Sequence, residues 1–401
     1  MPSSKKFSFD SLYAKSTPKG KSGNPPIRGK YDFAVAYPDP NSLPIKELIE
    51  SLTSGLEEEG RNLAIYPHPQ GYEPLREFIA TKVFNDRNIK TWSVIGPRAT
   101  LGLAAFEIAK EMEDLMVLTC DVSTSAGLDR FRKTYPEKYL DLGIAEQNMI
   151  GVAAGLASEN FKVMTTTFAP FQTIRCCEQI KVNLGYMKQK ICMVGIASGL
   201  VLGTLGFTHC CIEDVGILRS IPNLTIISPA DSFEVVKALK SALNYNGSTY
   251  IRLTGGSNNP IVYKKDYEFK IGKAITLRDG EDLTIFCTGS MVNEGIKVSE
   301  SLVKKNIKCK VINMHTIKPI DKEVIKNSSN TKLIVTLEEH NIIGGLGSAV
   351  SEVLSDIGIK TKLLRLGIKD AYNKGGTYKF LLAKNRLTHE KIIEDILKYY
   401  K

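Results

Sequence analysis

The sequence lacks the long apolar run that a membrane-spanning helix needs. No stretch of about 18 consecutive apolar residues occurs in the chain. The N-terminus also lacks the apolar core of a secretory signal peptide, so we expect a cytoplasmic chain that crosses no membrane. Hydrophobic residues nevertheless make up 43% of the 401 residues. That share is enough to form two or three buried cores.

Cysteines with the spacing of a zinc site are also absent. The eight cysteines include two adjacent pairs, Cys176–Cys177 and Cys210–Cys211, and no CxxC pattern. Adjacent residues cannot both supply tetrahedral ligands to one zinc ion. We therefore expect reduced thiols, as in other cytoplasmic proteins.

Acidic residues are scarce near the N-terminus. The formal net charge is +10, and residues 1–30 contain seven Lys or Arg against one acid, Asp10. This segment has no sustained periodicity and ends in a Gly/Pro cluster, so we expect a disordered basic arm. Because the rest of the chain is only mildly basic, we expect no nucleic-acid binding. A mildly basic body suits a phosphorylated substrate.

Residues 31–92 show helical periodicity around a turn-rich segment, Tyr66–Tyr72, which reads YPHPQGY. This pattern resembles the N-terminal part of fold-type I, pyridoxal-phosphate-dependent aminotransferases. In that family a large domain with a Schiff-base lysine follows, and this chain lacks such a domain. The resemblance implies an aminotransferase-like fragment without transaminase activity, which forms an N-terminal helical appendage.

From residue 97 onward, short apolar runs alternate with helical patterns such as Leu101–Met112, which is typical of an α/β fold with a mostly parallel sheet. The strands expected in a first domain, residues 97–260, are Leu115–Thr119, Lys162–Thr166, Ile191–Ile196, Leu224–Ile227 and Tyr250–Leu253. A second domain, residues 264–401, is expected to contain strands at Leu283–Cys287, Lys308–Asn313, Lys332–Thr336 and Lys362–Leu366, and helices at Asn293–Lys304, Gly345–Asp356 and His389–Tyr399. The sequence thus predicts two doubly wound α/β domains.

One carboxylate in the first domain stands among apolar and small residues. Glu146 follows Ile144 and Ala145 and precedes a small-residue helix, Val152–Ala157. A carboxylate in such surroundings is costly to desolvate unless a donor satisfies it, so Glu146 is a candidate functional acid. The alternative is a helix N-terminal glutamate satisfied by backbone amides.

A series of motifs after residue 97 resembles the C-terminal half of transketolases, which consists of a pyrimidine-binding domain and a C-terminal domain. The motifs follow the family order: TCDV at 119–122, SAGLDRF at 125–131, GIAEQN at 143–148, TFAPF at 167–171, GFTHCCIEDVGILRSIPN at 206–223, SPAD at 228–231, IRL at 251–253, NMHTIKPID at 313–321 and EEHNIIGGLGSAV at 338–350. The match is closest to split transketolases, whose two halves are separate polypeptides. It implies one subunit of a transferase that moves a two-carbon ketol unit between sugar phosphates.

The resemblance implies thiamine diphosphate as the cofactor. Glu146 matches the acid that hydrogen-bonds the pyrimidine N1′ atom, and a dry, apolar pocket suits that task because it keeps the proton on the acid. Phe168 and Phe171 match the aromatic residues that flank the pyrimidine ring. Ile144 and Asp121 are also expected at the cofactor.

Two further residues are expected at the substrate. His209 matches a histidine that exchanges protons with the reacting hydroxyls, and Arg252 matches an arginine that binds the sugar phosphate. At two positions where full-length transketolases carry a histidine and an aspartate, this chain has Ala197 and Leu205. Because polar groups recognise sugar hydroxyls, a modified, deoxy or branched sugar, or another keto substrate, is plausible.

The GDG motif, with which the family holds Mg²⁺ and the diphosphate, does not occur in the sequence. We therefore expect a partner subunit that carries the N-terminal transketolase half and binds most of the Mg²⁺ ligands, in an α2β2 assembly with no metal site of this chain's own. Three alternatives remain open: a subunit similar to deoxyxylulose-phosphate synthase, one similar to a keto-acid dehydrogenase β chain, and a non-catalytic scaffold.

Overall fold

The computed structural model describes residues 96–256 and 259–400. The predictions for the basic arm, residues 1–30, and for the aminotransferase-like fragment, residues 31–92, lie outside these described residues.

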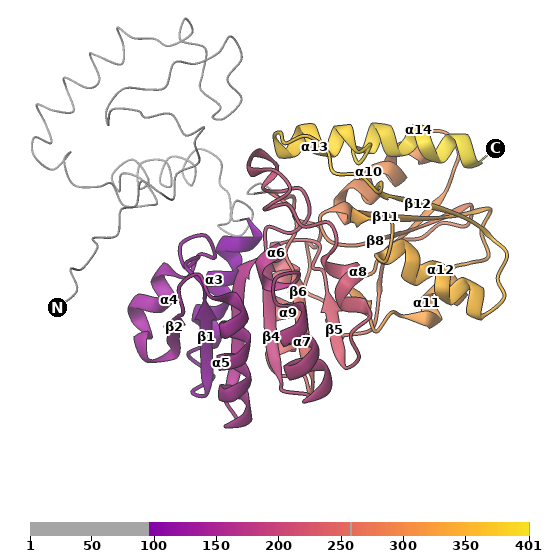
Figure 1. The fold of residues 1–401 in the computed structure, drawn as a ribbon. Helices are drawn as coiled ribbons and strands as arrows, with labels where there is room; N and C mark the ends of the chain where they lie inside the picture. The colour runs from indigo at the N-terminus through magenta and orange to yellow at the C-terminus, as the bar shows by residue number, and fades with distance from the viewer. Residues whose placement is uncertain (1–95, 257–258, 401) are drawn as a thin grey trace, which may run out of the picture. The chain divides into compact units, whose positions relative to one another are not determined.

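The first sheet has seven strands in the order β10-β5-β6-β4-β3-β1-β2 (Figure 1). Its strands are β1 (Leu115–Thr119), β2 (Tyr139–Asp141), β3 (Lys162–Phe168), β4 (Ile191–Ile196), β5 (Leu224–Ile227), β6 (Ser248–Arg252) and β10 (Thr316–Lys318). All pairings are parallel except that of β10 with β5. The associated helices are α3 (Pro97–Ile108), α4 (Asp129–Thr134), α5 (Glu146–Ser158), α6 (Ala169–Gln172), α7 (Cys177–Ile180), α8 (Asp214–Arg219) and α9 (Ser232–Leu243), with short helical turns η5 (Pro136–Lys138), η6 (Lys181–Tyr186) and η7 (Gly203–Leu205).

Strand β4 shows how this sheet is covered on both faces. All six of its residues are buried, as expected for a strand of a parallel sheet that has helices on both sides. Cys192, Val194 and Ile196 belong to a core shared with α3 and α9. The alternate residues Ile191 and Met193 point to the other face, into a core shared with α5, α7 and α8.

The second sheet has five strands in the order β12-β11-β8-β9-β7. They are β7 (Ile275–Arg278), β8 (Leu283–Cys287), β9 (Cys309–Asn313), β11 (Leu333–Asn341) and β12 (Lys362–Ile368). Its helices are α10 (Met291–Val303), α11 (Lys322–Asn327), α12 (Leu346–Asp356), α13 (Tyr378–Lys384) and α14 (His389–Tyr400). Helices α10 and α14 cover one face of the sheet, and α11 and α12 cover the other (Figure 1).

The two sheets are linked by β10, which follows β9 in the chain but belongs to the first sheet. Thr316 pairs with Ile227 and Lys318 pairs with Ile226 on the edge strand β5. The backbone N–H of Ser228 donates to the carbonyl of His315 at 2.7 Å. The edge of the first sheet is therefore covered by a segment that continues from the second.

The predicted α/β fold with two doubly wound units is confirmed. The strands predicted at Leu115–Thr119, Ile191–Ile196, Leu224–Ile227 and Leu283–Cys287 are found with the same bounds. The first helix was predicted at Leu101–Met112, but α3 begins at Pro97, whose fixed φ suits a first helical position. The edge strands β2, β7 and β10 were not predicted because three or four residues carry too little periodicity.

None of the helices in the described ranges combines the length and apolarity that crossing a membrane requires.

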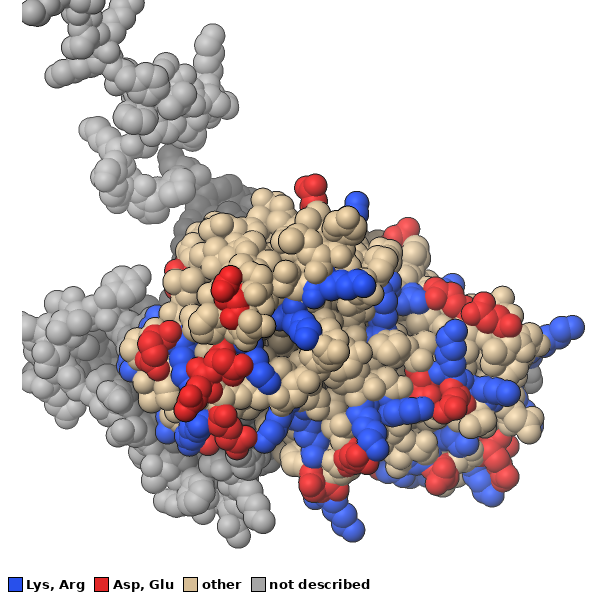
Figure 2. All heavy atoms as spheres, turned by 90° about the horizontal axis from the view of Figure 1, so that it is seen from below, with Lys and Arg blue, Asp and Glu red and all other residues tan. Residues whose placement is uncertain are grey.

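Figure 2 shows one face of the molecule, on which basic and acidic side chains are interspersed. The described part of this face therefore offers no continuous basic surface of the kind that binds nucleic acid.

Glu338 on β11 caps the start of α12 and gives the second unit a pH-dependent stability. Its side chain is 2% exposed, and its two carboxylate oxygens accept hydrogen bonds from the backbone N–H groups of Leu346 and Gly347 at 2.7 and 2.8 Å. Burial raises the pKa of Glu338 to about 7, although these hydrogen bonds oppose the shift. The folded state therefore binds the Glu338 proton more tightly than the unfolded state does.

We predict that Glu338→Gln becomes more stable relative to the parent chain as the pH rises. A raised carboxyl pKa means that folding stability falls between the unfolded pKa and the folded pKa, and glutamine cannot ionise. The difference in free energy of unfolding should shift by about 2 kcal/mol in favour of the variant between pH 5 and pH 8. Urea unfolding at both pH values measures it, with Glu352→Gln on the exposed side of α12 as control. A difference that does not vary with pH would contradict the prediction.

Candidate active site

Several candidate residues lie where the parallel strands of the first sheet end. Strand β1 ends two residues before Asp121, β2 ends five residues before Glu146, and β3 ends at Phe168. The carboxyl ends of parallel strands lie at one edge of a sheet, where α/β proteins bind their ligands. The topology therefore brings residues that are distant in sequence to one edge.

Glu146 is the first residue of α5, and its side chain is 5% exposed. Its Oε2 atom lies 2.8 Å from the Nη1 atom of Arg175. The partner that the structure gives this carboxylate is thus a guanidinium rather than the backbone amides of its own helix. Arg175 is 41% exposed, and its guanidinium lies 4.0 Å from the ring centroid of Phe171.

Phe168, Phe171 and His209 form a half-buried aromatic cluster beside this ion pair. The rings of Phe168 and Phe171 meet edge to face, with centroids 6.2 Å apart. The His209 ring lies 6.1 Å from Phe168 and 5.4 Å from Phe171, also in edge-on orientations. The structure therefore brings together Glu146, both phenylalanines and His209, and Arg175 connects the carboxylate to the cluster.

Asp121 and Ile144 flank the same edge but are exposed. The backbone N–H of Asp121, a residue with φ of +54°, donates to Asp141 Oδ1 at 3.0 Å, as does that of Gly143. Burial opposes ionisation of Asp141, but these and two further hydrogen bonds outweigh it and lower its pKa. Ile144 is 78% exposed. Ile144 therefore does not cover Glu146 within the described residues, and its apolar surface is open to another molecule. That Ile144 lies at the cofactor stays a prediction.

The geometry contradicts the prediction that Arg252 binds a sugar phosphate. Its side chain is 1% exposed, and its Nε atom lies 2.8 Å from the Oδ2 atom of the buried Asp214. Its Nη2 atom donates to the carbonyl oxygens of Cys211 and Glu339 at 3.2 and 2.9 Å. A guanidinium that is satisfied in this way cannot bind a substrate phosphate without leaving a buried carboxylate unpaired. Arg252 is a core residue.

The loop that contains His209 is apolar at the two positions noted in the sequence. Ala197 is 2% exposed, and Leu205 is 56% exposed. Cys210 and Cys211 are buried, and burial raises the pKa of Cys210 to about 11. Because the thiolate is the reactive form, these cysteines are not nucleophiles at neutral pH.

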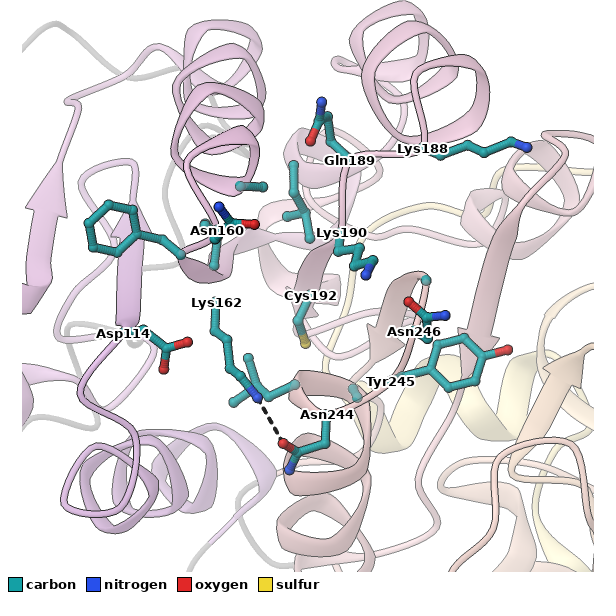
Figure 3. A pocket seen from close by; sticks show the side chains of 17 residues that line it. Asp114, Asn160, Lys162, Lys188, Gln189, Lys190, Cys192, Asn244, Tyr245 and Asn246 are labelled. Carbon is teal, nitrogen blue, oxygen red and sulfur yellow. Dashed lines mark hydrogen bonds between the residues drawn. The ribbon is translucent and has the colours of Figure 1, made fainter.

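A cavity of about 340 Å³ lies at the opposite, amino edge of the first sheet (Figure 3). Lys162, Lys188 and Lys190 line it, and the Nζ atom of Lys162 donates to Asn244 Oδ1 at 2.9 Å. The C-terminal ends of α5, η6 and α9 lead into the cavity, so these lysines complement the negative ends of the helix dipoles. Among the described residues that line it, Asp114 is the only carboxylate. The acid and the aromatic groups that could form an active site are thus found at the other edge.

Within residues 96–256 and 259–400, no group of three or more His, Cys, Asp or Glu side chains is arranged to hold a metal ion.

Comparison with known proteins decides the family. Residues 95–259 match the model of the transketolase pyrimidine-binding domain, and residues 272–392 match that of the transketolase C-terminal domain. One subunit of the apulose-4-phosphate transketolase of Phocaeicola vulgatus is 34% identical over 311 residues, which are 77% of this chain and 99% of the relative. The chain belongs to the transketolase family.

Two further transketolases show which part of the family the chain represents. The 6-deoxy-6-sulfo-D-fructose transketolase subunit SqwH of a Clostridium species is 37% identical over 288 residues, 72% of this chain and 89% of the relative. A solved structure titled "Split gene transketolase, inactive beta4 tetramer" is 34% identical, with a TM-score of 0.70, and the match covers 76% of this chain and 98% of that one. The predicted transketolase-type transferase subunit is thereby confirmed, and membership of the family implies dependence on thiamine diphosphate.

Three residues near the carboxyl ends of the strands of the first sheet were not predicted from the sequence. Arg175 follows Phe171 by four residues and could have been noticed as the nearest basic residue to the aromatic motif. Asp214 lies in the EDVG part of a family motif, and Glu339 lies in EEHN. Nothing in these strings shows that Asp214 pairs with Arg252, or that the Glu339 carboxylate accepts a hydrogen bond from the backbone N–H of Leu200, in the loop of His209.

We predict that Asp214→Asn lowers the free energy of unfolding by about 3 kcal/mol or more, because the buried charge of Arg252 then has no counterion. Thermal or urea unfolding of the full chain measures it. Glu107→Gln, which breaks an exposed pair with Lys110, is the control and should change stability by less than about 1 kcal/mol. Equal effects of the two substitutions would show that the Arg252–Asp214 pair does not hold this edge together.

Proposed function

We propose that this chain is the pyrimidine-binding and C-terminal half of a two-component, thiamine diphosphate-dependent transketolase, which transfers a two-carbon ketol unit between sugar phosphates. The observation that carries the proposal is the convergence of Glu146, Phe168, Phe171 and His209 at one edge of the first sheet. Together they provide a buried acid, an aromatic surface and a proton-transfer group.

These residues fit the pyrimidine end of the cofactor. Glu146 is buried at a helix start, and one of its carboxylate oxygens faces a half-exposed arginine. A heteroaromatic ring nitrogen can replace that arginine because Arg175 has solvent beside it. Phe168 and Phe171 present half-buried rings, and offset stacking on such rings contributes about 1 kcal/mol beyond burial.

When bound, thiamine diphosphate supplies the nucleophilic carbon that carries the two-carbon unit. Glu146 holds a proton at the pyrimidine N1′ atom, and the exclusion of water around it strengthens that hydrogen bond. Arg175, which is 41% exposed, would have to leave both Glu146 and the face of Phe171 to make room for the ring. His209 exchanges protons with the substrate hydroxyls. Asp121 and Ile144 contact the cofactor from the exposed side of the site.

The second half of the site comes from another chain in this proposal. The GDG motif with which the family holds Mg²⁺ and the diphosphate does not occur in this sequence, so both are bound mainly by a separate subunit that corresponds to the N-terminal half of transketolase. The proposed assembly is α2β2, with the cofactor between the two kinds of subunit. The exposed Ile144 beside the buried Glu146 is the apolar surface that this contact covers.

The apolar loop of His209 suggests the class of sugar. Ala197 is buried and Leu205 is exposed on the loop, and neither side chain can hydrogen-bond a hydroxyl group. When the polar side chain that recognises a particular sugar hydroxyl is missing, the site loses several kcal/mol of preference for sugars that carry this hydroxyl. We therefore propose a ketose phosphate donor that is modified, deoxy or branched where the common donor has that hydroxyl.

Residues 31–92 have no catalytic role in this proposal and are a remnant that resembles an aminotransferase fragment. We predict that deletion of residues 1–94 leaves ketol transfer by the two-subunit enzyme unchanged, because the matched family domains begin at residue 95. Steady-state kinetics of the shortened and full chains measure it. A retained aminotransferase in pull-downs with residues 31–92 would instead support the scaffold alternative.

We predict that Glu146→Gln lowers kcat for ketol transfer by about 100-fold or more, because glutamine cannot exchange a proton with the pyrimidine. The chain is co-expressed with a GDG-containing transketolase half, and transfer between a ketose phosphate and an aldose is assayed. Glu159→Gln, at the exposed C-terminal end of the same helix, should have no effect.

The same assay tests the proposed reaction against its closest relatives. Consumption of pyruvate with release of CO₂ in place of ketol transfer would assign the chain to the synthase or dehydrogenase alternative. Full activity of Glu146→Gln would refute the role given to this acid.

A further inference from the structure

Glu339, on β11 of the second sheet, directs a buried carboxylate into the first unit. Its side chain is 1% exposed. The Oε1 atom accepts a hydrogen bond from the backbone N–H of Leu200 at 2.7 Å. The Oε2 atom accepts hydrogen bonds from Ser290 Oγ at 2.5 Å and from the Tyr378 hydroxyl at 2.7 Å. Three donors thus offset the cost of burying this carboxylate.

Leu200 lies at the base of the loop that contains His209. Next to it, Gly199 and Cys211 form an isolated antiparallel bridge, with N···O distances of 2.8 and 2.9 Å. This bridge closes the loop between residues 199 and 211, two residues after His209. Glu339 therefore fixes the point from which the loop departs.

Gly199 shows how closely the carboxylate approaches the loop. A Cβ atom at this position would lie 2.3 Å from Glu339 Oε1, and the residue has a φ of +74°. Only glycine fits such a position without moving the carboxylate. The absence of a side chain at Gly199 is thus what lets Glu339 approach the loop so closely.

The second unit also holds the loop further along. The backbone N–H of Gly376 donates to the carbonyl of Gly203 at 2.9 Å. The rings of Phe207 and Tyr372 pack with centroids 5.1 Å apart. The loop of His209 is therefore held at its base by Glu339, in its middle by Gly376 and near its end by Tyr372.

We infer that Glu339 is a positioning residue for His209, through which the second unit sets the place of the histidine against Phe168 and Phe171. Glu339 touches neither ring, and it acts through the Leu200 amide and the bridge between Gly199 and Cys211. The importance of this position for ketol transfer rests on the proposed function. The positioning itself belongs to the chain alone and can be measured without a partner subunit or a cofactor.

The first measurement is the Cε1–H resonance of His209 in a ¹H–¹³C spectrum of the full chain. The chain has five histidines, and the His209 signal is assigned by its loss in His209→Gln. The two phenylalanine rings at 5.4 and 6.1 Å impose a ring-current shift on this signal. In Glu339→Ala the shift should collapse toward the value of an exposed histidine. Glu339→Gln keeps an acceptor for Leu200 and should retain most of the shift.

The second measurement is alkylation of cysteines, located by peptide mass mapping. Cys210 and Cys211 are 2% and 0% exposed, and they should react at least tenfold faster in Glu339→Ala. Cys287 and Cys309, in the core of the second unit, should react as slowly as in the parent chain. Glu338→Gln is the matched control, because the Glu338 carboxylate is directed to the start of α12 instead of the loop, and it should change neither measurement.

If Glu339→Ala does not fold, Gly199→Ala takes its place, because the added Cβ separates the loop base from Glu339 and leaves the carboxylate present. An unchanged His209 signal together with unchanged labelling of Cys210 and Cys211 would overturn the inference. So would a folded variant in which all buried cysteines become equally reactive, since that shows general loosening. Absence of ketol transfer in the two-subunit assay would count against the proposed function. It would not change what the His209 signal and the cysteine labelling say about the role of Glu339.

Discussion

A carboxylate that is removed from water needs a donor, and this requirement at Glu146 is the constraint on which the rest of the site depends. The side chain is 5% exposed and has a half-exposed arginine as its partner. Arg175 satisfies the acid while also covering the aromatic ring on which a second ring could stack. The same three groups therefore form a stable arrangement in this chain and a site that a heteroaromatic ligand can enter. In the proposed enzyme Glu146 supplies only one end of a cofactor site, because the GDG motif that serves the other end in this family does not occur in the sequence.

Buried charges also join the two α/β units. Arg252 at the end of β6 pairs with Asp214 and donates to the carbonyl of Glu339 on β11, while the side chain of Glu339 holds the loop that follows β4. Strand β10 adds a backbone connection, because it follows β9 of the second sheet and pairs with β5 as the outermost strand of the first sheet. A buried pair costs desolvation and needs full satisfaction, so these contacts specify one arrangement of the two units. The loop of His209 lies between them and takes its position from both.

The sequence predicted the parts of the fold that repeat a simple pattern. Ile191–Ile196 carries no polar side chain and follows Lys190, and this pattern is typical of a buried parallel strand. The short edge strand β10 could not be predicted, because its place depends on pairing with β5 about ninety residues earlier in the chain. Glu146, Phe168, Phe171 and His209 were found because motifs of a known family contain them. The role of Arg252 was misjudged because sequence shows a residue's place on a strand and does not show that Asp214 lies 2.8 Å from its guanidinium.

The central claim is that this chain supplies one end of the cofactor site and a partner subunit supplies the other. Its most direct test is the binding of thiamine diphosphate with Mg²⁺, measured by isothermal titration calorimetry. The cofactor is titrated into this chain alone, into a GDG-containing transketolase half alone, and into their mixture with either Glu146 or Glu146→Gln in this chain. We predict tight binding only in the mixture, and a loss of affinity of about tenfold or more with Glu146→Gln. Binding to this chain alone as tight as to the mixture, or an equal affinity of the Glu146→Gln mixture, would contradict the account.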